Sequence, residues 1–217
     1  PELPVFAGCP RPLIREPVTA EHVHGETGLN GCGLPPPGIQ AQPRHAVEWL
    51  VETCRKASEP ITVCTLGPFT NIASALIQAP DIVGGIESVV AMAGAVRTEG
   101  NITPAAEFNV YADPHSAQIV LESGIPMTWI PLDVTHQVLT TPDRLRRFAA
   151  LPAPIGPAVH GMLSFYYHPN EKRHGVPGSP LHDPCVMAYL LEPEMFSGKE
   201  VALSVETHSP LTSGLSL

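Results

Sequence analysis

The chain has few basic residues, and they form no cluster. Its 12 lysines and arginines stand against 21 aspartates and glutamates, which gives 217 residues a formal net charge of −9 at pH 7. A protein that binds a nucleic-acid backbone or an anionic membrane surface needs a basic patch. The composition therefore argues against nucleic acid and membrane as partners.

Long hydrophobic runs and paired cysteine motifs are also missing. No segment approaches the ~20 consecutive apolar residues that cross a bilayer, and residues 1–4 do not have the character of a signal peptide. The five cysteines are odd in number and lack Cys-x-x-Cys spacing. They indicate neither a disulfide framework nor a structural zinc site. These features favour a reducing, cytoplasmic location.

Apolar strand-like runs alternate with helical patterns along the chain, and 43% of the residues are hydrophobic. This alternation predicts an α/β fold with an open, mostly parallel sheet, helices on both faces and a single domain. Strands are expected at residues 60–65, 87–94, 125–133 and 199–207. Helices are expected at residues 44–57, around 72–76, from 113, from 142 and over 158–167.

A polar loop follows the second strand-like run. Residues 100–109, GNITPAAEFN, place Asn101, Glu107 and Asn109 between an apolar strand and a helix for which Asp113 is the expected N-cap. In an open α/β sheet, ligands bind beyond the carboxyl ends of the strands. The sequence therefore predicts a binding loop here.

Several motifs together resemble one family. The residues MAGA at 92–95, GN at 100–101, AEFN at 106–109 and DP at 113–114 are similar to the sugar-binding signature of the inosine-uridine nucleoside hydrolases, which cleave the N-glycosidic bond of ribonucleosides. Further similarities follow in the family's order: HGETGL from 24, TLGPFTNIA from 65, LDVTH from 132 and LHDPC from 181.

The resemblance implies how a ribonucleoside is bound. Asn101, Glu107 and Asn109 would hold the ribose hydroxyls, and Met92 would offer a soft apolar contact beside the sugar ring. Tyr166 belongs to a segment whose counterparts close over the nucleobase.

Two histidines are implied in departure of the base. His182 would protonate it, and an ordinary histidine pKa near 6.5 suits that task at neutral pH. His24 would lie near the active site and is linked to the same protonation. The residues alone leave His24 an alternative, a histidine that only bonds backbone in a tight loop.

The resemblance also implies a calcium ion whose bound water is the nucleophile. The main-chain carbonyl of Thr65 and the carboxylate of Asp183 are the two implied ligands, whereas calcium takes ~6–8 oxygens. On residue type alone, Thr65 simply ends a strand, and Asp183 before Pro184 caps a helix. Asp133, at the end of a predicted strand, is interpreted as bonding loop amides, although a catalytic group is also found at such places.

The family's Asp-x-Asp-x-Gly-x-Asp-Asp cluster has no counterpart and would precede Pro1, and its last strand and helix would follow Leu217. The hypothesis is a domain truncated at both ends, whose 217 residues alone fold poorly and are inactive.

The function predicted is hydrolysis of purine or pyrimidine ribonucleosides with calcium, by a protein that is a dimer or tetramer at full length. The alternative is a non-catalytic nucleoside- or ribose-binding protein of the same fold. A third hypothesis is an interaction domain with no ligand.

Overall fold

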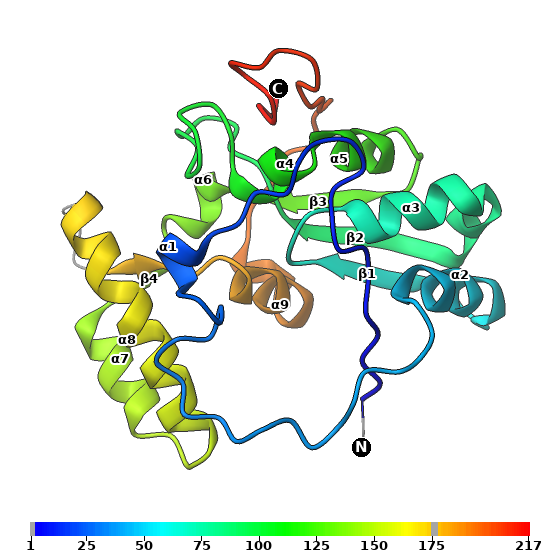
Figure 1. The fold of residues 1–217 in the computed structure, drawn as a ribbon. Helices are drawn as coiled ribbons and strands as arrows, with labels where there is room; N and C mark the ends of the chain where they lie inside the picture. The colour runs from blue at the N-terminus through cyan, green and yellow to red at the C-terminus, as the bar shows by residue number, and fades with distance from the viewer. Residues whose placement is uncertain (1–2, 175–177) are drawn as a thin grey trace. The chain divides into compact units, whose positions relative to one another are not determined.

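The computed structural model describes residues 3–174 and 178–217 (Figure 1), and its contacts divide the chain into two units. The sheet unit consists of Pro1–Pro17, Gln40–Val134 and Asp183–Leu217, and the helical unit consists of Val18–Ile39 and Thr135–His182. Organisation as a single domain stays a prediction.

Three parallel strands in the order β1-β2-β3 form the centre of the sheet unit. They are β1 (Ile61–Thr65), β2 (Ile86–Met92) and β3 (Met127–Ile130). Thr65 pairs with Ala91, which pairs with Trp129, so the carboxyl ends of the strands lie along one edge. The three strands confirm the prediction, although β3 is shorter than expected because Leu132–Thr135 form the helix α6.

Helices cover both faces of this sheet (Figure 1). The core on one face joins Val89 and Ala91 of β2 to three helices. These are α2 (Ala46–Lys56), α3 (Thr70–Gln78) and α5 (Pro114–Leu121). Val90 points to the other face, because side chains alternate along a strand. There α9 (Pro184–Leu191) packs on β2, with Tyr189 Oη 3.5 Å from Thr128 Oγ1. The predicted open α/β fold is confirmed.

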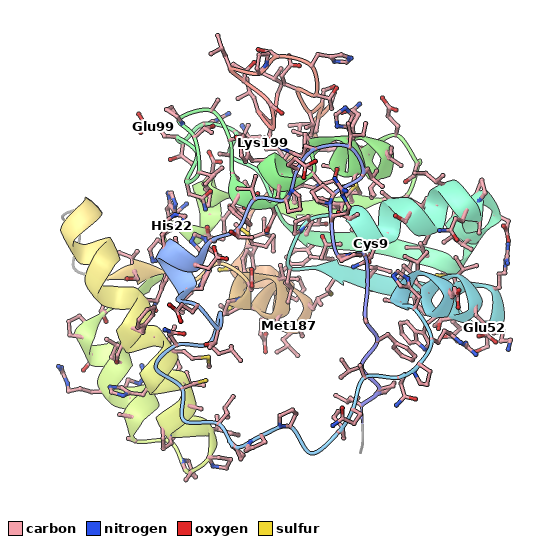
Figure 2. All side chains as sticks on the ribbon, in the orientation of Figure 1. Cys9, His22, Glu52, Glu99, Met187 and Lys199 are labelled. Atoms are coloured by element: carbon pink, nitrogen blue, oxygen red, sulfur yellow. The ribbon has the colours of Figure 1, made fainter. Side chains whose placement is uncertain are left out.

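The N-terminal segment, residues 3–17, forms a single bridge, from Phe6 to Gln42. It is otherwise held by hydrogen bonds to helices: Ala46 N donates to Ala7 O at 2.8 Å, and Cys9 N donates to Asn71 Oδ1 at 2.8 Å. Cys9 is labelled in Figure 2. The segment therefore runs from the start of α2 to the start of α3.

The strand expected over residues 199–207 is wrong. In this stretch only Val205 pairs, through an isolated bridge to Ser216, and Val205 N donates to Gln118 Oε1 at 2.9 Å. An alternating pattern becomes a strand only where a neighbouring strand supplies a ladder of partners, and here the pairing is limited to the main-chain hydrogen bonds of Ser204 with Leu217 and of Glu206 with Leu215.

The helical unit contains an antiparallel pair of short strands and a packed pair of helices. Its elements are α1 (Glu21–His24), β4 (Leu139–Thr140), α7 (Pro142–Ala149), α8 (Ile155–His174) and β5 (Ser179–Pro180). Helix α8 is longer than expected at both ends. Gly161 on α8 lies directly against the backbone of Gly31, where a Cβ would come within 1.9 Å of the Gly31 oxygen.

The sheet unit also contains a short helix, α4 (Phe108–Ala112), and two 3-10 turns, η1 (Pro80–Gly85) and η2 (Pro193–Met195). No helix within the described ranges combines the length and the apolar character needed to cross a membrane.

Candidate functional site

Glu107 fastens the loop that follows β2. Its Oε1 accepts a hydrogen bond from Asn109 N at 2.7 Å, and its Oε2 accepts from Gly94 N at 3.0 Å and Val110 N at 3.2 Å. The residue is 1% exposed and is the N-cap of α4. A helix therefore begins inside the polar loop, and one carboxylate joins it to the end of the neighbouring strand.

Burial raises the pKa of the Glu107 carboxyl above its ordinary value. The three amide hydrogen bonds act in the opposite direction, and the negative charge of Asp183 adds to the increase. The carboxylates of Glu107 and Asp183 are thus close enough to influence each other within the sheet unit.

The other residues implied in ribose binding belong to the same network. Asn109 Nδ2 donates to Met92 O at 3.0 Å and lies 3.5 Å from Met92 Sδ. Asn101 Oδ1 accepts from Phe108 N at 2.8 Å. The structure thus brings Met92, Asn101, Glu107 and Asn109 together, and it gives each asparagine side chain a role in holding the loop.

The two residues implied as metal ligands lie on the sheet unit. Thr65 is the last residue of β1, and its Oγ1 is buried without a hydrogen-bond partner among the described residues. Asp183 is exposed and precedes α9, which confirms a helix start at Pro184. Its carboxylate makes no capping hydrogen bond, so capping does not explain this aspartate.

Within residues 3–174 and 178–217, no group of three or more His, Cys, Asp or Glu side chains is arranged to hold a metal ion. Asp133 instead holds backbone, because its carboxylate accepts from Val96 N and Arg97 N at 2.8 Å each. The interpretation that Asp133 bonds loop amides is confirmed.

A cluster of rings surrounds His182 in the helical unit. Its Nδ1 lies 2.8 Å from Thr135 Oγ1, and its Nε2 lies 3.3 Å from Tyr166 Oη. The ring of His24 stacks on Tyr166 with centroids 5.8 Å apart, and His136 meets His182 edge-on at 6.0 Å. The structure thus brings the candidates His24, Tyr166 and His182 together.

The cluster lowers the pKa of His182 to about 4, through burial first and then through the charges of His136 and His24. The expectation of an ordinary histidine pKa was therefore wrong, because removal from water and positive neighbours both disfavour the imidazolium form. At pH 7 the ring is neutral. It offers one N–H donor and one nitrogen acceptor to its two hydroxyl partners.

The sequence did not reveal Thr135 and His136 as neighbours of His182. The LDVTH similarity marked their segment, but the contact joins residues 47 positions apart. Only the fold shows which side chain in that motif meets the histidine.

The whole chain, residues 1–217, matches the sequence pattern described as inosine-uridine preferring nucleoside hydrolase. The chain belongs to this family. An uncharacterized protein of Schizosaccharomyces pombe is 48% identical over 219 residues, and the match covers 100% of this chain and 70% of that protein. The pyrimidine-specific ribonucleoside hydrolase RihA of Shewanella baltica is 44% identical, with 100% and 68% covered.

Solved nucleoside hydrolases share the fold as well. The purine-preferring ribonucleoside hydrolase from Gardnerella vaginalis superposes with a TM-score of 0.92 at 29% identity, covering 100% of this chain and 70% of that one. The plant nucleoside hydrolase PpNRh1 gives 0.90 at 27% identity, with 99% and 68% covered. The open parallel sheet described above is therefore a nucleoside hydrolase sheet.

Proposed function

We propose that the protein hydrolyses the N-glycosidic bond of ribonucleosides, giving ribose and the free base. The observation that carries this proposal is the hydrogen-bonded network of buried Met92, Glu107 and Asn109 with exposed Asn101, beyond the carboxyl end of β2, in a member of the nucleoside hydrolase family. Overall, water adds a hydroxyl to the anomeric carbon, and the base leaves with a proton.

The network suits recognition of ribose. The sugar becomes oxocarbenium-like as the bond breaks, so hydroxyl partners must be fixed in place beforehand. Glu107 and Asn109 are fixed because main-chain groups of both β2 and α4 hold their side chains. In this proposal Glu107, Asn101 and Asn109 bind the hydroxyls, and Met92 packs beside the ring.

The cluster in the helical unit suits departure of the base. His182 is neutral at pH 7 and holds no extra proton, so as one ring nitrogen gives its proton toward the base, the other must take one up from its hydroxyl partner. The attacking water, which loses a proton on bonding to the anomeric carbon, is the net source of the proton that leaves with the base. Thr135 at Nδ1 and Tyr166 at Nε2 fix the orientation of the ring, and both hydroxyls can donate or accept, so either neutral tautomer is satisfied. We propose His182 as the group that gives the proton, with Tyr166 in contact with the base and His24 supporting Tyr166 by stacking.

The proposed substrates are purine and pyrimidine ribonucleosides of the inosine-uridine type. RihA, at 44% identity, is named pyrimidine-specific, and the structural relative from Gardnerella vaginalis, at 29%, is named purine-preferring. These names support testing uridine and cytidine first and inosine beside them.

We also propose calcium as the cofactor, with the Asp183 carboxylate and the Thr65 carbonyl as two of its oxygens. A calcium ion takes ~6–8 oxygens, usually with several carboxylates. Among the described residues, no group of three or more His, Cys, Asp or Glu side chains is placed to hold a metal ion. The donor set of these residues therefore does not amount to a calcium site by itself.

Two further proposals concern the protein's state. A dimer or tetramer follows from the family resemblance, and a mass above the 23.1 kDa of one chain in light scattering would support it. A cytoplasmic location is supported by the five cysteines, none of which forms a disulfide.

The test is release of ribose from uridine, cytidine and inosine at millimolar calcium, measured with a reducing-sugar assay on the wild type and three variants. Release of ribose by the 217 residues would also contradict the hypothesis that they are inactive alone. We expect His182→Gln to lower kcat by about 10²–10⁴-fold and Tyr166→Phe to lower it less. His22→Gln is the matched control, because His22 is exposed on α1 beside His24 (Figure 2).

Binding of nucleosides without release of ribose would instead support the non-catalytic binding protein. Equal rates for the wild type and His182→Gln would contradict the role given to His182. Neither result depends on which nucleobase is preferred.

A further inference from the structure

Asp113 is a buried carboxylate with donors from three separate parts of the sheet unit. Its Oδ2 accepts from Leu13 N at 3.0 Å and from Thr70 Oγ1 at 2.6 Å, and its Oδ1 accepts from Ser116 N at 3.2 Å. The residue is 0% exposed. Only the Ser116 bond belongs to the helix cap that the sequence predicts.

The three donors lie on elements that carry the candidate site. Thr70 begins α3, directly after the loop that leaves β1 at Thr65, and Leu13 belongs to the N-terminal segment. Asp113 itself follows α4, the short helix that contains Asn109. A single carboxylate therefore joins the loop after β1 to the helix that follows the loop after β2.

The N-terminal segment holds α4 at a second point. The guanidinium of Arg15 donates to Tyr111 O and lies 4.0 Å from the centroid of the Tyr111 ring. Together with the bond from Leu13 to Asp113, this contact fixes the C-terminal half of α4. Glu107 fixes the N-terminal half.

A cap alone does not require this arrangement. Serine, threonine or asparagine caps a helix as well as aspartate does, whereas a buried charge is costly unless several donors satisfy it. Asp113 has such donors from outside its own helix. The carboxylate therefore connects α5 to the N-terminal segment and to α3.

We propose that Asp113 is a positioning residue for ribose recognition: through Thr70 and Leu13 it sets the place of Asn109 and Glu107 relative to the end of β1. This inference rests on the proposed function, because it concerns the same site. Asp113 itself does not touch the substrate in this proposal.

The test compares Asp113→Asn and Thr70→Val with Thr70→Ser, which keeps the donor. Glu122→Gln is the matched control, because Glu122 is an exposed carboxylate at the other end of α5 that accepts a hydrogen bond from Gln118 Nε2 at 2.6 Å. Binding of pseudouridine, whose C–C glycosidic bond is not hydrolysed, is measured by calorimetry, and thermal unfolding is measured in parallel.

We expect Asp113→Asn and Thr70→Val each to weaken pseudouridine binding by about tenfold in protein that is still folded, and Thr70→Ser to restore it. The double variant should bind no more weakly than the weaker-binding single variant, since both changes act on the one contact between Thr70 and Asp113. A lower melting temperature with unchanged affinity in Thr70→Val would overturn the proposal and leave Asp113 as a simple cap. If Asp113→Asn does not fold, the comparison of pseudouridine binding by Thr70→Val and Thr70→Ser tests the proposal.

Hydrogen exchange separates this inference from the proposed function. If the wild type binds no nucleoside, the proposed function fails. The effect of the contact between Thr70 and Asp113 on the loop and α4 is then tested by the rate of amide hydrogen exchange over residues 100–112. Faster exchange there in Thr70→Val than in Glu122→Gln supports the positioning role. Equal exchange in the two variants refutes it.

Discussion

At His182, the surroundings change the chemistry that the residue type suggests. A histidine in water is partly charged near neutral pH, but this ring lies among His24, His136 and Tyr166, and its pKa is lowered to about 4. The ring is therefore a neutral partner for two hydroxyls. Its pKa also links the stability of the helical unit to pH.

We expect acid to destabilise the protein through His182. The unfolded chain binds a proton near pH 6.5 and the folded chain only near pH 4, so the free energy of unfolding falls as pH falls through this window. The loss from this residue reaches about 3 kcal/mol at pH 4 and is absent above pH 7. Urea unfolding at pH 7, 6 and 5 measures it.

His182→Gln is the control for that measurement, because glutamine does not titrate. It changes the stability at every pH through its lost hydrogen bonds, so the quantity to compare is the slope between pH 7 and pH 5. An identical slope in the wild type and the variant would mean that the His182 pKa is not lowered on folding.

Three acidic side chains of the sheet unit bind main-chain amides. Glu107, Asp113 and Asp133 each accept hydrogen bonds from main-chain amides. The sequence shows where such acids stand but not whose amides they hold. A carboxylate that holds loops in place and one that acts on a substrate look the same in a sequence.

Among the elements, α8 depends on a close backbone approach. Gly161 on this helix lies against Gly31, and a Cβ at Gly161 would stand 1.9 Å from the Gly31 oxygen and 2.8 Å from its carbonyl carbon. Backbone atoms cannot relieve such a contact by changing rotamer as a side chain can. The helix and the segment around Gly31 would have to separate.

Gly161→Ala should therefore destabilise the helical unit by about 1–3 kcal/mol, although alanine is the better helix former. Gly33→Ala in the same unit is the matched control, because a Cβ there meets nothing within 4 Å and the φ angle is not positive. Thermal unfolding of both variants measures the difference. A Gly161→Ala protein as stable as the wild type would show that α8 does not depend on this contact.

For the molecule as a whole, calcium binding is the property that can be measured directly. The described residues supply Asp183 and Thr65 as oxygen donors but no group of three ligating side chains. We therefore expect the 217 residues to show no calorimetric calcium binding at micromolar concentration, since two oxygens fall far short of the ~6–8 that the ion takes. Addition of EDTA should leave the melting temperature unchanged.

Tight binding that is lost in Asp183→Asn would contradict this expectation. It would also show that oxygens beyond the two named here reach the ion. The exposed pair of Asp81 and Arg55 offers a control, because Asp81→Asn removes an exposed carboxylate elsewhere on the sheet unit.

The sequence by itself determined the fold class, the position of the polar loop at residues 100–109 and the family. Strands β1 and β2 and helices α2, α3 and α5 followed from periodicity and caps, because these signals are local. The expected strand over residues 199–207 failed because strand pairing depends on a distant partner. The helix α4 was missed because its five residues are too few to show a helical period in the sequence.

Tertiary structure decided the chemistry of the side chains. The low pKa of His182, the buried charge of Asp113 and the contact of Thr135 with the histidine all arise from residues far apart in the chain. Burial and charge act through space, so the sequence names the groups and only the fold gives their surroundings. For this protein, the sequence supplied the candidate residues and the structure supplied their protonation states and their supports.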